Sequence, residues 1–364
     1  MKGLKNQQMI DSKEKILKNL IKSRANWING KGPLSDVVVS SRIRLARNIN
    51  NIPFTSRANK MELEKVSKMV QKVFNENTIL SHFNHLALDK LSPLEVQFLT
   101  EKNLISRHFI QVNNSHRSCI FNREEALSVM INEEDHIRIQ LLSAGLQLKK
   151  IWKAIDKIDD EIEKKVIYAF QKQEGYLTSC PTNVGTGMRG SVMLHLPALV
   201  MQNRIEEILK ALSKIGYAVR GFYGEGSMAM GDIFQISNQI TLGISEEEII
   251  DSLIRLCKKI VIQEKNERKN LLSSSRKELE DRAWRAYGLL HNARIISSTE
   301  AMELLSKLRF GVELGFVSKI SLCQLNQLMQ IIQPAYLQMA LGKKLKKLER
   351  DFQRAILIRK EFSK

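Results

Sequence analysis

The chain has 364 residues, enough for about two domains, and hydrophobic residues make up 43% of it, so a sizeable core is expected. With 6 prolines and 18 glycines, it is not a low-complexity chain. The formal net charge of +18 indicates anionic partners. Because the sequence has no zinc-finger spacing and no aromatic RNA-binding motif, we expect phosphate compounds or a protein partner and no direct nucleic-acid ligand.

The four cysteines are scattered without a C-x-x-C pair, which argues against a zinc site or a disulfide framework. The basic N-terminus has no small-residue cleavage site, and no stretch of about 18 apolar residues is present. We therefore expect a cytoplasmic protein without a secretory signal or a membrane span.

Hydrophobic periodicity and turn residues predict the elements of the first two thirds of the chain. Residues 12–30 are predicted to form a helix and a turn, 36–47 a strand, and 56–74 and 92–106 two helices, the second capped by Ser92. Residues 118–122 and 126–143 are predicted as strands joined by a turn, and 148–170 as a long amphipathic helix. A loop at 175–190 precedes a strand at 191–196, a helix at 204–216 and short strands within 217–226, 232–239 and 240–243.

From Ser245 onward the pattern is almost wholly helical, and Ser297 with Glu300 resembles a capping box. The polar stretch 265–275 is either a linker or a helix junction. We predict an N-terminal helical segment at 1–30, an α+β domain at 31–265 and an all-helical domain at 266–364.

The segment VVVSSRIRLARN, from Val37 to Asn48, places Arg42 and Arg44 in a β-branched stretch. Side chains alternate faces along a strand, so both arginines are predicted to point the same way. One interpretation is an exposed edge with solvated charges. The other is a phosphate clamp, because the guanidinium fork matches phosphate oxygens.

The loop GTGMRG matches G-x-G-x-x-G at Gly185, Gly187 and Gly190, but a strand follows it instead of a helix, which argues against a dinucleotide site. P-loop and protein-kinase signatures are absent from the sequence. Five arginines remain in strand-like or glycine-flanked settings: Arg42, Arg44, Arg138, Arg189 and Arg220. Such a set suits a triphosphate with Mg²⁺, held for transfer of its γ-phosphoryl group.

Two acidic stretches complement these arginines. NEEDH contains Glu133, Glu134 and Asp135, and YGEG contains Glu225. Either stretch alone is typical of an acidic surface turn, but together they suit a cationic acceptor such as a guanidinium, from which one carboxylate could take a proton. Cys180 is either a plain buried thiol or an activated thiolate.

The segments SSRIRLARN, NEEDHIRI, CPTNVGTGMRGSV, RGFYGEG and QISNQ together resemble the ATP:guanido phosphotransferases, the family of arginine and creatine kinases. Within it, three features favour the bacterial protein-arginine kinases. The arginine strand begins only about forty residues into the chain, Tyr223 stands where small-substrate kinases typically carry arginine, and RDFQRA matches the R-D-x-x-R-A motif of a phosphoarginine-sensing pocket. The resemblance implies a mainly antiparallel sheet flanked by helices, with an all-helical C-terminal domain.

The resemblance also implies roles for individual residues. The implied ATP-binding residues are Ser40, Ser41, Arg42, Ile43, Arg44, His108, Arg138, Arg189, Gly190, Ser191, Val192, Met193, Arg220, Gly221, Phe222, Tyr223, Gly224 and Glu225. Glu134 takes the position of the catalytic base, Glu225 pairs with it on the guanidinium, and Cys180 takes the position of a reactive cysteine. Mg²⁺ is expected to be held mainly by ATP. The implied phosphoarginine-binding residues are Arg350, Asp351, Arg354 and Ala355.

The expected function is therefore phosphorylation of protein arginines by ATP, which marks proteins for Clp-dependent degradation. The resemblance implies a stress and quality-control setting with a zinc-binding activator (McsA), a heat-shock repressor (CtsR), a Clp ATPase–protease and a homodimer or higher homo-oligomer. Two alternatives stay open: a kinase for free arginine or another phosphagen, and a catalytically silent adaptor that recognises phosphoarginine.

Overall fold

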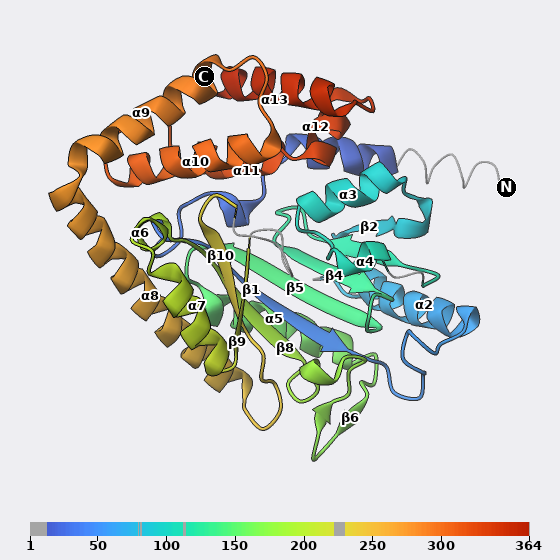
Figure 1. The fold of residues 1–364 in the computed structure, drawn as a ribbon. Coiled ribbons are helices and arrows are strands. Elements are labelled where there is room, and N and C mark those ends of the chain that lie inside the picture. Colours follow the sequence, from blue (N-terminus) through green and yellow to red (C-terminus); the bar gives the residue numbers. More distant parts are fainter. Residues whose placement is uncertain (1–12, 79, 81, 112–113, 222–229, 364) are drawn as a thin grey trace.

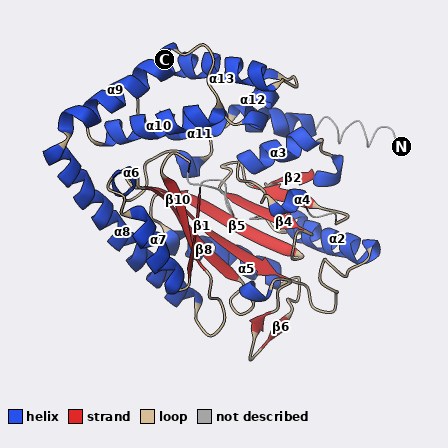
Figure 2. Ribbon diagram, in the orientation of Figure 1, coloured by secondary structure: helices blue, strands red, loops and turns tan. Residues whose placement is uncertain are grey.

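The structure is a computed structural model and describes residues 13–78, 80, 82–111, 114–221 and 230–363. Its centre is an eight-stranded sheet in the order β2-β3-β4-β5-β1-β8-β10-β9, with every neighbouring pair antiparallel (Figures 1 and 2). Its strands are β1 (Val38–Arg47), β2 (Asn84–Ala87), β3 (Ser118–Phe121), β4 (Leu127–Ile131), β5 (Ile137–Ala144), β8 (Met188–His195), β9 (Tyr217–Gly221) and β10 (Ile233–Asn238). A separate hairpin consists of β6 (Phe170–Gln171) and β7 (Gly175–Tyr176).

One face of the sheet is apolar and carries the main core. Ile43 and Leu45 of β1 and Val192 of β8 are fully buried there, because alternate residues of each strand turn to the same side. Four helices pack on this face: α2 (Lys60–Glu76), α5 (Leu148–Glu163), α7 (Ile205–Lys214) and α8 (Glu246–Ser274). The opposite face is therefore the one left for polar side chains.

Side-chain caps begin several helices, and the sequence predicted those at Ser92 and Ser297. Asn59 accepts hydrogen bonds from the backbone of Met61 and Glu62 at the start of α2. Ser92 forms a complete capping box with Glu95 at the start of α3 (Pro93–Glu101). Ser297 accepts from the Glu300 backbone at the start of α10 (Ser298–Glu313).

A second apolar cluster covers part of the polar face at the β2 end of the sheet. It joins Leu17 and Leu20 of the helical residues 13–22, Phe98 and Leu99 of α3, and Tyr336 of α12 (Pro334–Leu341). The part of the chain before α8 also contains short helical segments: η1 (Asn26–Ile28), η2 (Leu88–Lys90), α4 (His108–Gln111), η3 (Pro181–Asn183) and α6 (Pro197–Met201).

The last hundred residues form helices around their own apolar cluster, above the sheet in Figure 1. Besides α10 and α12 they are α9 (Arg276–Asn292), α11 (Leu322–Ile331) and α13 (Lys347–Phe362). The cluster includes Ile233 of β10, so the helical part packs directly on the sheet.

A buried group of charges lies at the same junction. Glu313 of α10 forms ion pairs with Arg309 at 2.8 Å and with Arg268 of α8 at 2.9 Å, and Arg268 also pairs with Glu264 at 2.8 Å. Burial opposes ionisation of Glu313, but the two arginines hold its pKa below the ordinary value. His195, at the end of β8, contacts Ser306 of α10 at 2.9 Å. These contacts tie the helical part to the strands of the sheet.

The structure differs from the sequence-based expectation at the end of α5 and at residues 240–243. Helix α5 ends at Glu163 rather than at residue 170, because the following residues are extended: Ala169 N donates to the Asn48 carbonyl at 2.8 Å. Residues 240–243 form no strand. Of the two interpretations of the polar stretch 265–275, the structure shows the helix junction, since α8 continues to Ser274 and meets α9 at Ser275.

Candidate active site

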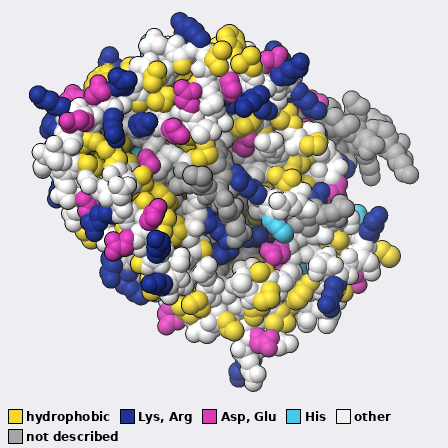
Figure 3. Space-filling view, in the orientation of Figure 1, with side chains coloured by type: hydrophobic (Ala, Val, Ile, Leu, Met, Phe, Trp, Pro, Cys, Tyr) yellow, Lys and Arg dark blue, Asp and Glu magenta, His cyan; other side chains and the backbone are white. Residues whose placement is uncertain are grey.

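Strand register brings the five predicted arginines to the polar face of the sheet. Directly opposed residues on antiparallel strands point to the same face. Arg44 of β1 is directly opposite Arg189 of β8. Arg138 of β5 is directly opposite Ala46, and the side chain of Ala46 points to the same face as those of Arg42 and Arg44, because alternate residues of a strand share a face. Arg220 of β9 faces Gln235, whose other partner is Met193, the residue opposite Ser40. Figure 3 shows basic side chains at the centre of this side of the molecule, over the sheet.

Arg42 is held by two polar neighbours. Its Nη2 donates to Gln235 Oε1 at 2.8 Å, and its Nε donates to Ser191 Oγ at 3.4 Å. Burial, together with the charges of Arg138, Arg189 and Arg220, lowers the pKa of Arg42 to about 10. Arg138, Arg189 and Arg220, which strand register brings to this face, are thus the arginines that lower the pKa of Arg42.

Arg44 carries donors without acceptors. Its Nε and Nη2 are buried, and the described part of the chain supplies no hydrogen-bond partner for either atom. Burial and then the charges of Arg42, Arg138 and Arg189 lower its pKa well below the ordinary value. Because unpaired buried charges are destabilising, this arrangement fits a polyanion that would supply the acceptors.

A small pocket opens on the same face beside Arg42. It is lined by Trp27, Ser40, Arg42, Asn103, Leu142, Ser191, Met193 and Gln235. Four of these residues belong to the predicted ATP-binding set. Trp27, Asn103, Leu142 and Gln235 do not. The alternation of Gln235 and Ser237 in QISN could have indicated Gln235, but no sequence signal marked Trp27.

The remaining predicted ATP-binding side chains divide between the two faces. Ile43 and Val192 lie in the core, and the Ser41 hydroxyl donates to the Gly145 carbonyl at 2.7 Å. The Gly190 N–H donates to Asn238 Oδ1 at 2.8 Å. These four residues therefore stabilise the strands and lie on the face of the sheet opposite the arginines. Gly221 ends β9, and Phe222, Tyr223, Gly224 and Glu225 lie outside the described residues.

The NEEDH turn between β4 and β5 lies beside Arg138. Arg138 Nη1 is 2.8 Å from Glu133 Oε2 and 3.9 Å from Glu134 Oε2. Glu133 is fully buried and also accepts a hydrogen bond from the Ser106 hydroxyl. Glu134 remains 30% exposed, so of the two it is the carboxylate that an acceptor can reach.

The environment of Glu134 raises its pKa. Burial is the main cause, and the Asp135 charge adds to it, while Arg138 and His108 of α4 act in the opposite direction. A carboxylate with a raised pKa is a better proton acceptor near neutral pH than an ordinary one. A raised pKa and partial exposure are properties that a general base requires, and Glu134 combines the two.

Asp135 connects this turn to the loop that carries Cys180. Its Oδ1 accepts from Asn48 Nδ2 and from Ser179 N, both at 2.7 Å. Cys180 follows directly, and its Sγ lies 3.1 Å from Thr182 Oγ1. Asp135 thus holds the end of β1, the Glu134 turn and the Cys180 loop together. The sequence marked Asp135 as acidic but did not indicate this structural role.

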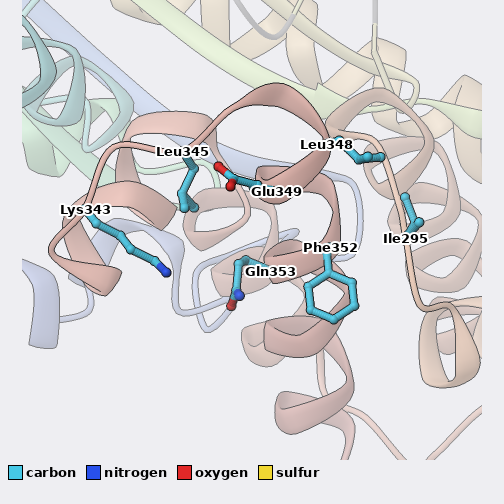
Figure 4. A pocket seen from close by; sticks show the side chains of 7 residues that line it. All are labelled: Ile295, Lys343, Leu345, Leu348, Glu349, Phe352 and Gln353. Atoms are coloured by element: carbon cyan, nitrogen blue, oxygen red, sulfur yellow. The ribbon is translucent and has the colours of Figure 1, made fainter.

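The C-terminal motif RDFQRA lies on α13. Arg354 is 1% exposed and donates to the carbonyls of Ile332 at 2.9 Å and Ile296 at 2.8 Å, while it pairs with Asp351. Ala355 belongs to the helical core, and Arg350 is half-buried. An adjoining pocket of about 330 Å³ is lined by Ile295, Lys343, Leu345, Leu348, Glu349, Phe352 and Gln353 (Figure 4).

Within the described ranges, no helix is both long and apolar enough to cross a membrane. Over the same residues, His, Cys, Asp and Glu side chains form no group of three or more that could hold a metal ion.

Comparisons with known proteins agree with the fold. The family model for the ATP:guanido phosphotransferase C-terminal catalytic domain matches residues 65–267, and the model for the protein-arginine kinase McsB C-terminal domain matches residues 276–364. A "Protein-arginine kinase" of Pelotomaculum thermopropionicum is 48% identical over 345 residues, which is 94% of this chain and 96% of the relative. One of Bacillus cereus is 46% identical over 350 residues, 96% of this chain and 98% of the relative.

Solved structures show the same fold. A lombricine kinase superposes with a TM-score of 0.58 at 25% identity, covering 65% of this chain and 68% of that one. The duplicated taurocyamine kinase of Schistosoma mansoni gives 0.57 at 24% identity, covering 66% and 36%. The fold and the arginine face thus define a guanidino-group phosphotransferase. The chain belongs to the ATP:guanido phosphotransferase family, in its branch of protein-arginine kinases.

Proposed function

We propose that this protein transfers the γ-phosphoryl group of ATP to the guanidinium of arginine residues in proteins. The observation that carries the proposal is the convergence of five arginines on one sheet face, where Arg44 has buried donors with no acceptor in the described structure. Glu134 at the edge of this face supplies the negative charge that a cationic acceptor requires. Relatives named protein-arginine kinase, similar over nearly the whole chain, support a protein acceptor.

In the proposed reaction, the substrate guanidinium gains a phosphoryl group and loses a proton. A guanidinium nitrogen of the substrate attacks the γ-phosphorus, a P–N bond forms, and the bond from the γ-phosphorus to the β–γ bridging oxygen breaks to release ADP. Glu134 accepts the proton that the nitrogen loses. Arg42, Arg44 and Arg189 stabilise the charge on the transferring group. Mg²⁺, bound to ATP, would neutralise phosphate charge.

Glu225 and Cys180 have supporting roles in this proposal. Glu225 is assigned to the guanidinium together with Glu134, by resemblance alone, since it lies outside the described residues. We assign Cys180 to the acceptor side, and the hydrogen bond from Ser179 N to Asp135, next to Glu134, supports this assignment. We keep both as candidate catalytic residues, and His108 as an ATP contact near Glu134.

The cellular setting is also a proposal. We infer a cytoplasmic enzyme that marks damaged proteins for a Clp ATPase–protease, controls the repressor CtsR and works with the zinc-binding activator McsA. The helical part, residues 266–364, is proposed to form a homodimer and to bind phosphoarginine through Arg350 and Asp351. Arg354 has a structural role in that site, because it donates its hydrogen bonds to the backbone carbonyls of Ile332 and Ile296.

The test is a competition between acceptors. The protein is incubated with γ-labelled ATP, an unfolded protein such as β-casein and free L-arginine, with and without the activator. We expect acid-labile label on the unfolded protein. Label on free arginine alone would identify a small-molecule kinase. No transfer under any condition, combined with phosphoarginine binding, would identify the silent adaptor.

A further inference from the structure

A buried tryptophan lines the pocket on the arginine face. Trp27, in η1, is 5% exposed and borders the pocket together with Ser40, Arg42 and Ser191. Its indole Nε1 is buried, and none of the described residues accepts a hydrogen bond from it. A buried donor without a partner is destabilising. This donor is therefore expected to be matched by something that the protein binds.

The indole is fixed in place by both parts of the protein. Asn326 of α11 donates to the Ile28 carbonyl at 3.2 Å, and Asn26 N donates to the Glu124 carbonyl at 3.3 Å. The ring packs with Leu142, and Leu142 is the cross-strand partner of Arg42. A preorganised donor of this kind loses little conformational freedom when a ligand arrives.

The two ends of the arginine face differ in chemistry. Along β1 and β8 the opposed pairs run from Arg44 with Arg189, through Arg42 with Ser191, to Ser40 with Met193. The first end is strongly cationic. The second end adjoins Trp27, whose aromatic ring and single donor suit an uncharged ring system that carries nitrogen and oxygen acceptors.

We propose that Trp27 positions the nucleoside part of ATP, by donating its Nε1–H to an acceptor of the base or the ribose. This inference rests on the proposed ATP site and extends it to a residue of the N-terminal segment. Trp27 touches the nucleotide far from the transferring phosphoryl group. Its loss should therefore weaken ATP binding and leave the chemical step intact.

The test is Trp27→Phe, which keeps an aromatic ring and removes the donor. We expect the KM for ATP to rise roughly three- to tenfold, as the loss of one hydrogen bond implies, with kcat within about twofold of wild type. Inhibition by tripolyphosphate, which has the phosphates and lacks the nucleoside, should be unchanged. Trp152→Phe is the matched control, because Trp152 Nε1 donates to Glu247 at 3.4 Å on an exposed surface.

A second measurement does not depend on the folding of that variant. The protein has 3 tryptophans, so Trp152→Phe and Trp284→Phe identify the Trp27 indole N–H signal in an ¹⁵N spectrum by elimination. We expect this signal to shift with ATP and not with tripolyphosphate. An unshifted signal at saturating ATP, or an unchanged KM in Trp27→Phe, would overturn the role of Trp27. Failure of the wild-type protein to bind ATP would instead overturn the proposed function.

Discussion

Arg44 of β1 and Arg189 of β8 are directly opposed cross-strand partners on the polar face of the sheet. Like charges in this relation destabilise a sheet unless an anion lies between them. The same face also carries Arg42 of β1, Arg138 of β5 and Arg220 of β9. We therefore interpret the free protein as one that carries an unfavourable charge cluster, which ATP neutralises.

Replacing one of these arginines should stabilise the free protein and abolish its response to ATP. For Arg44→Met we expect the unfolding free energy without ligand to rise by about 1 kcal/mol, because a buried unpaired cation is removed. Thermal unfolding with and without ATP and Mg²⁺ measures both effects. Arg255→Met, at an exposed position on α8, is the control and should keep the ATP-dependent rise in Tm. An Arg44→Met variant with a wild-type ATP response would remove Arg44 from the site.

Glu134→Gln should impair the chemical step. We expect kcat to fall by roughly 10²–10⁴-fold, with ATP affinity changed far less, because the variant keeps the shape of the side chain and loses the proton acceptor. Exposed Glu174→Gln serves as the control. Wild-type-like turnover in Glu134→Gln would show that the base lies elsewhere.

The pH profile gives a second test of the same residue. The pKa of Glu134 is raised, and the ionised form is the base, so activity should increase with pH through a limb displaced above the range of an ordinary carboxyl group. Initial rates at saturating ATP between pH 5 and pH 8 measure it. An acid limb at the ordinary carboxyl position would contradict this assignment.

The fold and the site were predictable from sequence to different extents. The face shared by Arg42 and Arg44 follows from the period of two in a strand, and the caps at Ser92 and Ser297 follow from local spacing. The end of α5 was not predictable, because the helical pattern continues to residue 170. In the structure a turn follows Glu163, and backbone hydrogen bonds to residues 48–50 hold residues 167–169 in an extended conformation. Trp27 joins the pocket only through packing, which no local pattern encodes.

The buried charges at the domain junction should be costly to break. Glu313→Gln leaves Arg309 and Arg268 without their carboxylate, and we expect a loss of about 3–5 kcal/mol in unfolding free energy. The exposed pair of Lys68 and Glu64, whose charged atoms lie 2.7 Å apart, provides the contrast: Glu64→Gln should change the unfolding free energy far less than Glu313→Gln. Urea unfolding of both variants makes the comparison, and equal costs would mean that the junction is not a stabilising element.

A pH-dependent stability is expected at the contact of α3 with α12. Glu101 accepts from Ala335 N at 2.9 Å and Tyr336 N at 2.7 Å, yet burial raises its pKa to about 7. The folded protein therefore binds a proton here that the unfolded chain has already lost between about pH 4.5 and pH 7, so this group makes stability fall as pH rises through that window. Relative to Glu101→Gln, wild type should lose about 1–3 kcal/mol between pH 5 and pH 8 in urea unfolding. If the difference in unfolding free energy between the two proteins stayed the same from pH 5 to pH 8, Glu101 would not be the source of the pH dependence.

The RDFQRA motif should separate into a structural and a binding residue. Arg354→Met removes donors to two buried carbonyls, so we expect a loss of about 2–4 kcal/mol. Arg350→Met should change stability by less than about 1 kcal/mol and weaken binding of free phosphoarginine, measured by calorimetry. Unchanged phosphoarginine binding by Arg350→Met would place that ligand elsewhere.

The most direct test is to locate the transferred phosphate. An unfolded protein substrate is incubated with ATP, Mg²⁺ and either wild type, Arg44→Met or Glu134→Gln, and its peptides are sequenced by mass spectrometry under conditions that preserve acid-labile P–N bonds. We predict phosphate on arginine side chains with wild type and almost none with either variant. Phosphate confined to hydroxyl side chains, or equal arginine phosphorylation by all three proteins, would contradict the account.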